Sequence, residues 1–172
     1  MSTEAPQPVN LVVPRGTRVA VVAARFNAKI VDELLAGCLR RLKALGITDD
    51  RVETHRVPGA FELPVAAKVL AQTHKFSAVV CLGCVVRGDT PHFDYVAGEA
   101  ARGIQRVAVD EALPVIFGVL TTNTEQQALD RIGGTHGHAG ERAAEAAVEM
   151  IAMVSGARGK ETRGHGDKGT RG

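Results

Sequence analysis

The residues Gly88, Asp89, Thr90 and His92 follow directly after a strongly apolar run at 78–86. A glycine and a hydroxyl just before a helix leave backbone N–H groups free to hold a phosphate, although the same turn can be an ordinary helix N-cap. An imidazole titrates near neutral pH, so a histidine beside an anion site is a candidate general acid or base; alternatively it is a structural first-turn residue. The stretch therefore indicates an anion-binding turn with a proton-transfer group beside it.

Short stretches with polar or aromatic residues also follow the three other predicted strands. They are residues 25–27, residues 59–62 and residues 121–123. Ligands of an open α/β sheet bind outside the carboxyl ends of its strands, so these stretches are expected to converge on one rim. Arg131, a little further along the chain, is either a solvated surface charge or a bidentate clamp for a phosphate.

Aromatic residues gather at the same places. The chain contains five Phe and one Tyr, and the rings at or just beyond the predicted strand ends are those of Phe26, Phe61, Phe93, Tyr95 and Phe117. An aromatic side chain normally buries its large area in a core, which here is left to Ala, Val, Leu and Ile. Rings at the rim predict stacking on a flat ligand; the alternative is that each ring plugs a helix–strand junction.

Apolar periodicity predicts the elements that position these residues. The expected strands are 17–24, 51–57, 78–86 and 114–120, and the expected helices are 28–46, 58–73, 93–111, 124–133 and 140–154. Short, continuously apolar, β-branched runs are typical of strands covered on both faces. Their alternation with helices predicts an α/β fold, a three-layer αβα sandwich around a four-stranded parallel sheet. Residues 10–14 form a further candidate strand with no crossover helix, which we expect to join a neighbouring subunit's sheet.

Length and composition bound the organisation and the function. We expect a flexible arm at 1–9, a single domain at 10–154 and a disordered, basic, Gly-rich tail at 155–172. The formal charge of +2 is concentrated in the tail, so the body has no basic excess and does not suggest a nucleic-acid platform. No apolar run approaches the roughly 20 residues that span a membrane. Three cysteines and no secretory signal favour a cytoplasmic location.

Two motifs resemble metal-binding motifs, but their geometry or ligand number argues against a metal site. Cys81 and Cys84 form a CxxC, but residues three apart in a strand point to opposite faces, so their sulfurs cannot share a metal or easily form a disulfide. His136 and His138 have no third ligand at a suitable spacing. The chain has neither a GxGxxG nor a P-loop motif, which argues against a dinucleotide or a nucleoside triphosphate.

Five motifs in order resemble the lumazine synthase family. They are RFN (25–27), PGAFELP (58–64), GCVVRGDTPHFDYV (83–96), FGVLTTNTEQQALDR (117–131) and GERAAEAAVEM (140–150), within a resemblance that runs from about 9 to 154. The resemblance implies a flavodoxin-like fold. It also implies condensation of 5-amino-6-(D-ribitylamino)uracil with 3,4-dihydroxy-2-butanone 4-phosphate to 6,7-dimethyl-8-ribityllumazine. Phosphate and water are released, and no cofactor or metal is involved.

The resemblance further implies a role for each matching residue. The pyrimidine substrate would be bound by Phe26, Ala60, Phe61, Glu62, Cys84, Val85, Val86 and Phe117, the last reaching across from an adjacent subunit. The phosphate substrate would be bound by Asp89, Thr90 and Arg131, and His92 would shuttle protons during imine formation and phosphate loss.

Assembly is also implied by the resemblance. The family forms homopentamers that stay single, pair or close into a sixty-subunit shell, with riboflavin synthase as a further partner. The compact stretch at 131–140 favours the shell.

One position departs from the family pattern. Many members carry a phosphate-contacting lysine just before the glycine that starts the last helix, and here that position is Ala139. His136, His138 or Arg142 could replace its charge.

Two other functions fit parts of the sequence. The aromatic rim alone would suffice for a non-catalytic module that binds a flavin or pterin-like ring. The Arg- and Gly-containing tail could contact RNA, although the slightly acidic body argues against this.

Overall fold

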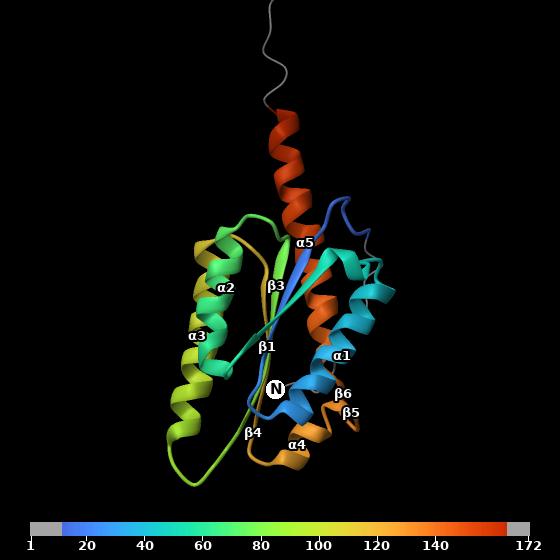
Figure 1. The fold of residues 1–172 in the computed structure, drawn as a ribbon. Coiled ribbons are helices and arrows are strands. Elements are labelled where there is room, and N and C mark those ends of the chain that lie inside the picture. Colours follow the sequence, from blue (N-terminus) through green and yellow to red (C-terminus); the bar gives the residue numbers. More distant parts are fainter. Residues whose placement is uncertain (1–11, 165–172) are drawn as a thin grey trace, which may run out of the picture.

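The computed structural model describes the backbone of residues 12–164 and the side chains of residues 12–158 (Figure 1). Four parallel strands form the main sheet in the order β2-β1-β3-β4. They are β1 (Val19–Ala24), β2 (Val52–Val57), β3 (Ala78–Val86) and β4 (Val115–Thr122). The helices are α1 (Ala28–Ala44), α2 (Leu63–Gln72), α3 (His92–Asp110), α4 (Glu125–Leu129) and α5 (Ala139–Gly164). The structure confirms the predicted α/β fold and its four-stranded parallel sheet, in a flavodoxin-like three-layer sandwich.

Helices cover both faces of the sheet, as the continuously apolar strands predicted. Figure 1 shows α2 and α3 on one side and α1 and α5 on the other. All six residues of β1 are buried, and their side chains alternate between the two layers. Val21 packs in the cluster with Leu34 of α1, whereas Val22 packs in the cluster with Ile104 of α3.

The CxxC of β3 is divided between these two cores. Cys81 belongs to the cluster under α2 and α3, and Cys84 to the cluster under α1 and α5. Both thiols are free and buried. Burial raises the pKa of Cys81 to about 12 and that of Cys84 to about 11. The two residues are packing elements, as the strand geometry predicted.

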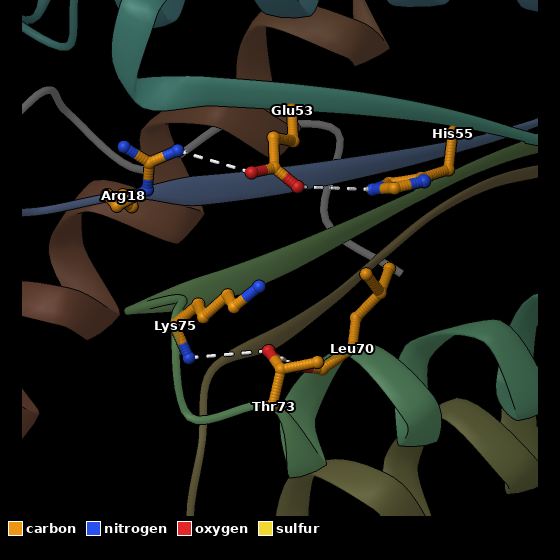
Figure 2. A network of polar contacts seen from close by, with 6 residues as sticks. All are labelled: Arg18, Glu53, His55, Leu70, Thr73 and Lys75. Carbon is orange, nitrogen blue, oxygen red and sulfur yellow. Dashed lines mark hydrogen bonds and ion pairs between the residues drawn. The ribbon is translucent and has the colours of Figure 1, made fainter.

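Polar contacts hold the amino-terminal ends of the strands together (Figure 2). The Arg18 guanidinium donates to Glu53 Oε1 on the neighbouring strand β2 at 3.2 Å, and His55 Nε2 lies 3.7 Å from Glu53 Oε2. In the turn between α2 and β3, the Lys75 backbone N–H donates to Thr73 Oγ1 at 3.3 Å. Arg18 and Glu53 satisfy one another, whereas His55 Nε2 is buried without a hydrogen-bond partner among the described residues and relies on the longer contact with Glu53.

The last helix is longer than predicted. It runs from Ala139 through Gly164, whereas the sequence predicted that the helix ends at residue 154 and that a disordered tail follows. Arg158 Nη2 donates to the Ala112 carbonyl at 3.0 Å and ties this extension to the body. A helix whose first turns are fixed by packing extends at little further cost, a factor that composition alone does not show. None of the helices in the described part of the chain is long and apolar enough to cross a membrane.

Several smaller features also differ from the sequence predictions or lie outside the structure. Residues 60–62 form a separate 3₁₀ turn before α2, and a short hairpin of β5 (Ile132–Gly134) and β6 (Gly137–His138) follows α4. Residues 1–11 and 165–172, which include the predicted arm and the first two residues of the candidate strand at 10–14, lie outside the described residues, and residues 12–14 form no strand within the described chain. The pairing of that strand with a neighbouring subunit stays a prediction.

Two glycines let α5 and its preceding hairpin approach α1 closely. A Cβ on Gly140 would overlap the Leu34 backbone carbonyl, and a Cβ on Gly37 would overlap the His138 ring. The Leu34 obstacle is backbone and cannot turn aside as a side chain can. Gly156, further along the same helix, has open space around its Cβ position.

We therefore expect Gly140→Ala and Gly156→Ala to change stability in opposite directions. Gly140→Ala should lower the free energy of unfolding by about 3 kcal/mol, since it forces α5 away from α1. Gly156→Ala should raise it by ~0.5–1 kcal/mol through helix propensity alone. Urea denaturation of both variants measures this, and equal effects of the two would contradict the close approach.

Candidate functional site

A cavity of about 340 Å³ opens at the carboxyl ends of β1 and β3, where strand order switches direction. It is lined by Phe26, Asn27, Gly59, Ala60, Phe61, Cys84, Val85, Val86, Gly88, Thr90, His92, Phe93 and Val96. Eight of these are residues that the sequence predicted for the site, and they come from four separate stretches of the chain. The cavity is mostly apolar, with its polar groups at one end, as expected for a small-molecule site.

Two aromatic rings at the cavity stay accessible to a ligand. The side chains of Phe26 and Phe61 are 73% and 56% exposed, respectively. A ring that merely plugged a helix–strand junction would be buried, so the exposure favours the predicted stacking surface over the alternative. Tyr95 is also exposed but does not line the cavity.

Phe26 is positioned by its neighbour Asn27, a residue of the strand-end stretch 25–27 to which the sequence analysis assigned no role. Asn27 adopts left-handed backbone angles, φ 55° and ψ 45°, at the start of α1. Its Nδ2 donates to the Cys84 carbonyl at 2.8 Å, which joins the end of β1 to the end of β3. The Phe26 backbone N–H donates to the Pro58 carbonyl at 3.0 Å. Asparagine between a strand and a helix is the signal that could have identified this turn, because it tolerates left-handed angles.

Glu62 holds the wall behind Phe61 and does not line the cavity. Its Oε2 accepts from the Gly59 backbone N–H at 2.8 Å and closes the 3₁₀ turn that carries Ala60 and Phe61. The sequence predicted that Glu62 binds the ligand; in this structure its carboxylate is engaged with the turn.

The polar end of the cavity is the exposed turn between β3 and α3. Thr90 and His92 both line the cavity, and His92 is the first residue of α3. The His92 backbone N–H donates weakly to Thr90 Oγ1 at 3.4 Å. Asp89 is exposed and does not line the cavity. The turn offers free backbone donors, a hydroxyl and an imidazole within reach of one bound molecule.

Two predicted residues lie elsewhere, on the side of the edge strand β4. Phe117 is 42% exposed and lines a separate depression of about 230 Å³ together with Ala139 and Arg142. Arg131 Nη1 donates to the Gln127 carbonyl at 2.7 Å, and the residue does not line the cavity. A single chain therefore does not bring Phe117 or Arg131 to the cavity.

The two histidines of the hairpin are arranged differently from one another. The His138 ring packs against Gly37, and burial lowers its pKa, with Glu141 opposing the shift. His136 Nδ1 lies 3.0 Å from Thr135 Oγ1. Within residues 12–164 no cluster of three His, Cys, Asp or Glu side chains could hold a metal ion.

Asn27 gives a test of how the site is built. Asn27→Gly keeps the left-handed turn at no steric cost but removes the bond to Cys84, so we expect a loss of ~1 kcal/mol in the free energy of unfolding. Asn27→Ala loses the same bond and also strains the backbone, for a total of ~2–3 kcal/mol. Thermal and urea unfolding measure both, and an alanine variant as stable as the glycine variant would contradict the strained turn.

A comparison with known protein families identifies the family of the chain. The sequence profile of the family described as 6,7-dimethyl-8-ribityllumazine synthase matches residues 16–155 of the chain. The matched range contains every residue of the cavity and also the β4 side with Phe117, Arg131 and Ala139.

Proposed function

Since the chain belongs to the 6,7-dimethyl-8-ribityllumazine synthase family, we propose that it condenses 5-amino-6-(D-ribitylamino)uracil with 3,4-dihydroxy-2-butanone 4-phosphate. The product is 6,7-dimethyl-8-ribityllumazine, with release of phosphate and water. The observation that carries the proposal is the meeting of an exposed aromatic wall and an anion-type turn in one cavity.

The pyrimidine substrate occupies the aromatic end. Phe26 stacks on its ring, while Ala60 and Phe61 contact its edge and the ribityl chain. Backbone groups of residues 84–86 supply further polar contacts, because these residues line the cavity at the open end of β3. Glu62 fixes the turn through the bond from the Gly59 backbone N–H to its Oε2. The remaining acceptor positions of its carboxylate can accept hydrogen bonds from the ribityl hydroxyls.

The phosphate substrate occupies the turn before α3. Free N–H groups around Asp89 and the Thr90 hydroxyl hold its phosphate. Since one chain does not bring Arg131 to its own cavity, we assign the neutralising charge to Arg131 of an adjacent subunit. Arg131 spends one N–H on the Gln127 carbonyl and retains four of the five that a guanidinium offers. His92 transfers protons during imine formation and phosphate loss, because it is exposed at the boundary between the two substrate positions.

The site is completed by a neighbouring subunit. Phe117 lies outside the cavity of its own chain, on the free edge of the sheet, and remains accessible. We assign it to the pyrimidine site of the adjacent subunit in a homopentamer. In the pentamer the Phe117 ring would contact a ligand of the adjacent subunit, whereas in a monomer this aromatic ring on an edge strand would stay exposed to solvent.

Arg142 supplies the charge that the lysine at position 139 provides in many family members. It lines the same depression as Ala139 and lies one helical turn beyond it, on the same helix face. Its Nη1 donates to the His136 carbonyl at 2.9 Å, and it forms no ion pair among residues 12–158. His138 is a poor substitute, because burial against Gly37 disfavours its charged form.

The central test supplies both substrates to the purified protein and follows lumazine fluorescence and free phosphate. His92→Ala should lower kcat by ~10–10⁴-fold and leave pyrimidine binding nearly unchanged, as expected for loss of proton transfer alone. His74→Asn is the matched control, since His74 is exposed, lies far from the cavity and has φ 55°, which asparagine tolerates.

Binding of the pyrimidine without any product from the native protein would favour the non-catalytic ring-binding module instead. An unchanged kcat in His92→Ala would remove His92 from the mechanism.

The charge at Arg142 has its own test. Arg142→Gln should raise KM for the butanone phosphate roughly tenfold, because it removes one charge-assisted contact at a partly exposed site. The double variant Arg142→Gln, Ala139→Lys should restore KM, since it returns a cation one turn earlier. KM for the pyrimidine should stay constant in both variants.

If the hairpin histidines held the phosphate, the outcome would differ. Arg142→Gln would then leave KM for the phosphate substrate unchanged.

A further inference from the structure

The turn between β3 and α3 carries the proposed phosphate and proton-transfer groups but has few bonds of its own. Residues 87–92 are all exposed, and a Cβ on Gly88 would meet nothing within 4 Å. The internal bonds of the turn are the weak contact from His92 to Thr90 and the Asp94 N–H donating to the Pro91 carbonyl at 3.0 Å. Something else must fix the turn relative to the sheet.

Arg87, the first residue after β3, makes contacts on both sides of the turn. Its backbone N–H donates to the Thr122 carbonyl at 2.9 Å and extends the pairing with β4. Its Nε donates to Asn123 Oδ1 at 3.1 Å. On the α3 side, Nη2 and Nη1 donate to the two carboxylate oxygens of Asp94 at 3.0 and 3.4 Å. Its Cζ lies 4.1 Å from the centroid of the Phe93 ring, which lines the cavity.

We propose that Arg87 is a positioning residue, which fixes the turn Gly88–Pro91 and the His92 imidazole against the aromatic wall. The inference rests on the proposed function for its catalytic consequence. The planar Arg87 guanidinium bonds to Asn123 after β4 and to Asp94 in the first turn of α3. The side chain therefore links both ends of the turn Gly88–Pro91 to the end of the sheet. A lysine keeps the charge but cannot form the bidentate pair, the Nε bond and the ring stack at once.

The expected effects on stability and on rate are therefore very different. The ion pair is partly exposed, with side-chain accessibilities of 42% for Arg87 and 60% for Asp94, so breaking it should change stability little. A displacement of reacting groups by about 1 Å can lower a rate on the order of a hundredfold. A purely structural ion pair would instead change stability and leave the turnover of the folded protein unchanged.

The test compares Arg87→Lys with Arg106→Gln in the full-length protein. Arg106 forms an ion pair with Asp110 within α3, with side-chain accessibilities of 83% and 47%, and makes no hydrogen bond or ion pair with the turn. Arg87→Lys should lower kcat roughly 10–100-fold. KM for the pyrimidine should change less than about twofold, and Tm by less than a few degrees. Arg106→Gln should leave all three quantities unchanged. An Arg87→Lys protein with native kcat would overturn the proposal.

Two further measurements keep the inference separate from the proposed function. Asp94→Asn should lower kcat by a similar factor. The double variant with Arg87→Lys should be no worse than either single variant, because both substitutions break the same ion pair. Additive losses in kcat would overturn the positioning role of Arg87.

Amide hydrogen exchange at Gly88, Asp89, Thr90 and His92 should be faster in Arg87→Lys and unchanged in Arg106→Gln. If the native protein forms no product, the proposed function fails. Unchanged amide exchange of the turn in Arg87→Lys would overturn the positioning role of Arg87, whether or not the native protein forms product.

Discussion

The two central strands of a parallel sheet with helices on both faces have almost no room for polar side chains, and this constraint organises the whole molecule. Each residue of β1 is buried, and the first seven residues of β3 are buried as well. Polar chemistry is therefore displaced to the strand ends. Towards the amino-terminal ends, Glu53 of the edge strand β2 contacts Arg18 and, at a longer distance, His55. At the carboxyl ends, the polar groups face a cavity.

The carboxyl rim is held by a small number of bonds between loops. Asn27 joins the first loop to β3, Glu62 closes the second, and Arg87 spans the turn before α3 and the end of β4. None of these three contacts is a backbone ladder bond, so each depends on one side chain of the right shape. The sheet fixes which loops meet, and these side chains fix how they meet.

Sequence patterns were sufficient for the fold and for most of the rim. The bounds of β3 were predicted to the residue, because an unbroken apolar run ends abruptly at a charged one. Eight predicted residues line the cavity, since any parallel sheet brings its carboxyl strand ends together.

The rest depended on contacts between segments far apart in the sequence. The bond from Asn27 to Cys84 joins residues 57 positions apart, and no local pattern marks it. The extension of α5 past residue 154 follows from helix propagation and from the bond of Arg158 to Ala112, neither of which composition reveals. Phe117 was expected at or just beyond a strand end, but it is the third of the eight residues of β4, on the free-edge side of the sheet and away from the cavity. Arg131 follows α4 and does not line the cavity either. Neither placement can be read from a local pattern, because it depends on the strand order and on the length of β4.

The exposure of Phe26 and Phe61 has a thermodynamic consequence. Both rings are hydrated in the free protein, and a flat ligand stacked against them would remove that apolar surface from water. Burial of apolar surface lowers the heat capacity of the complex below that of its separated components. The binding enthalpy of a flat ligand must then become more favourable as temperature rises. The entropic share of the binding free energy is therefore largest at low temperature, and the enthalpic share grows on heating.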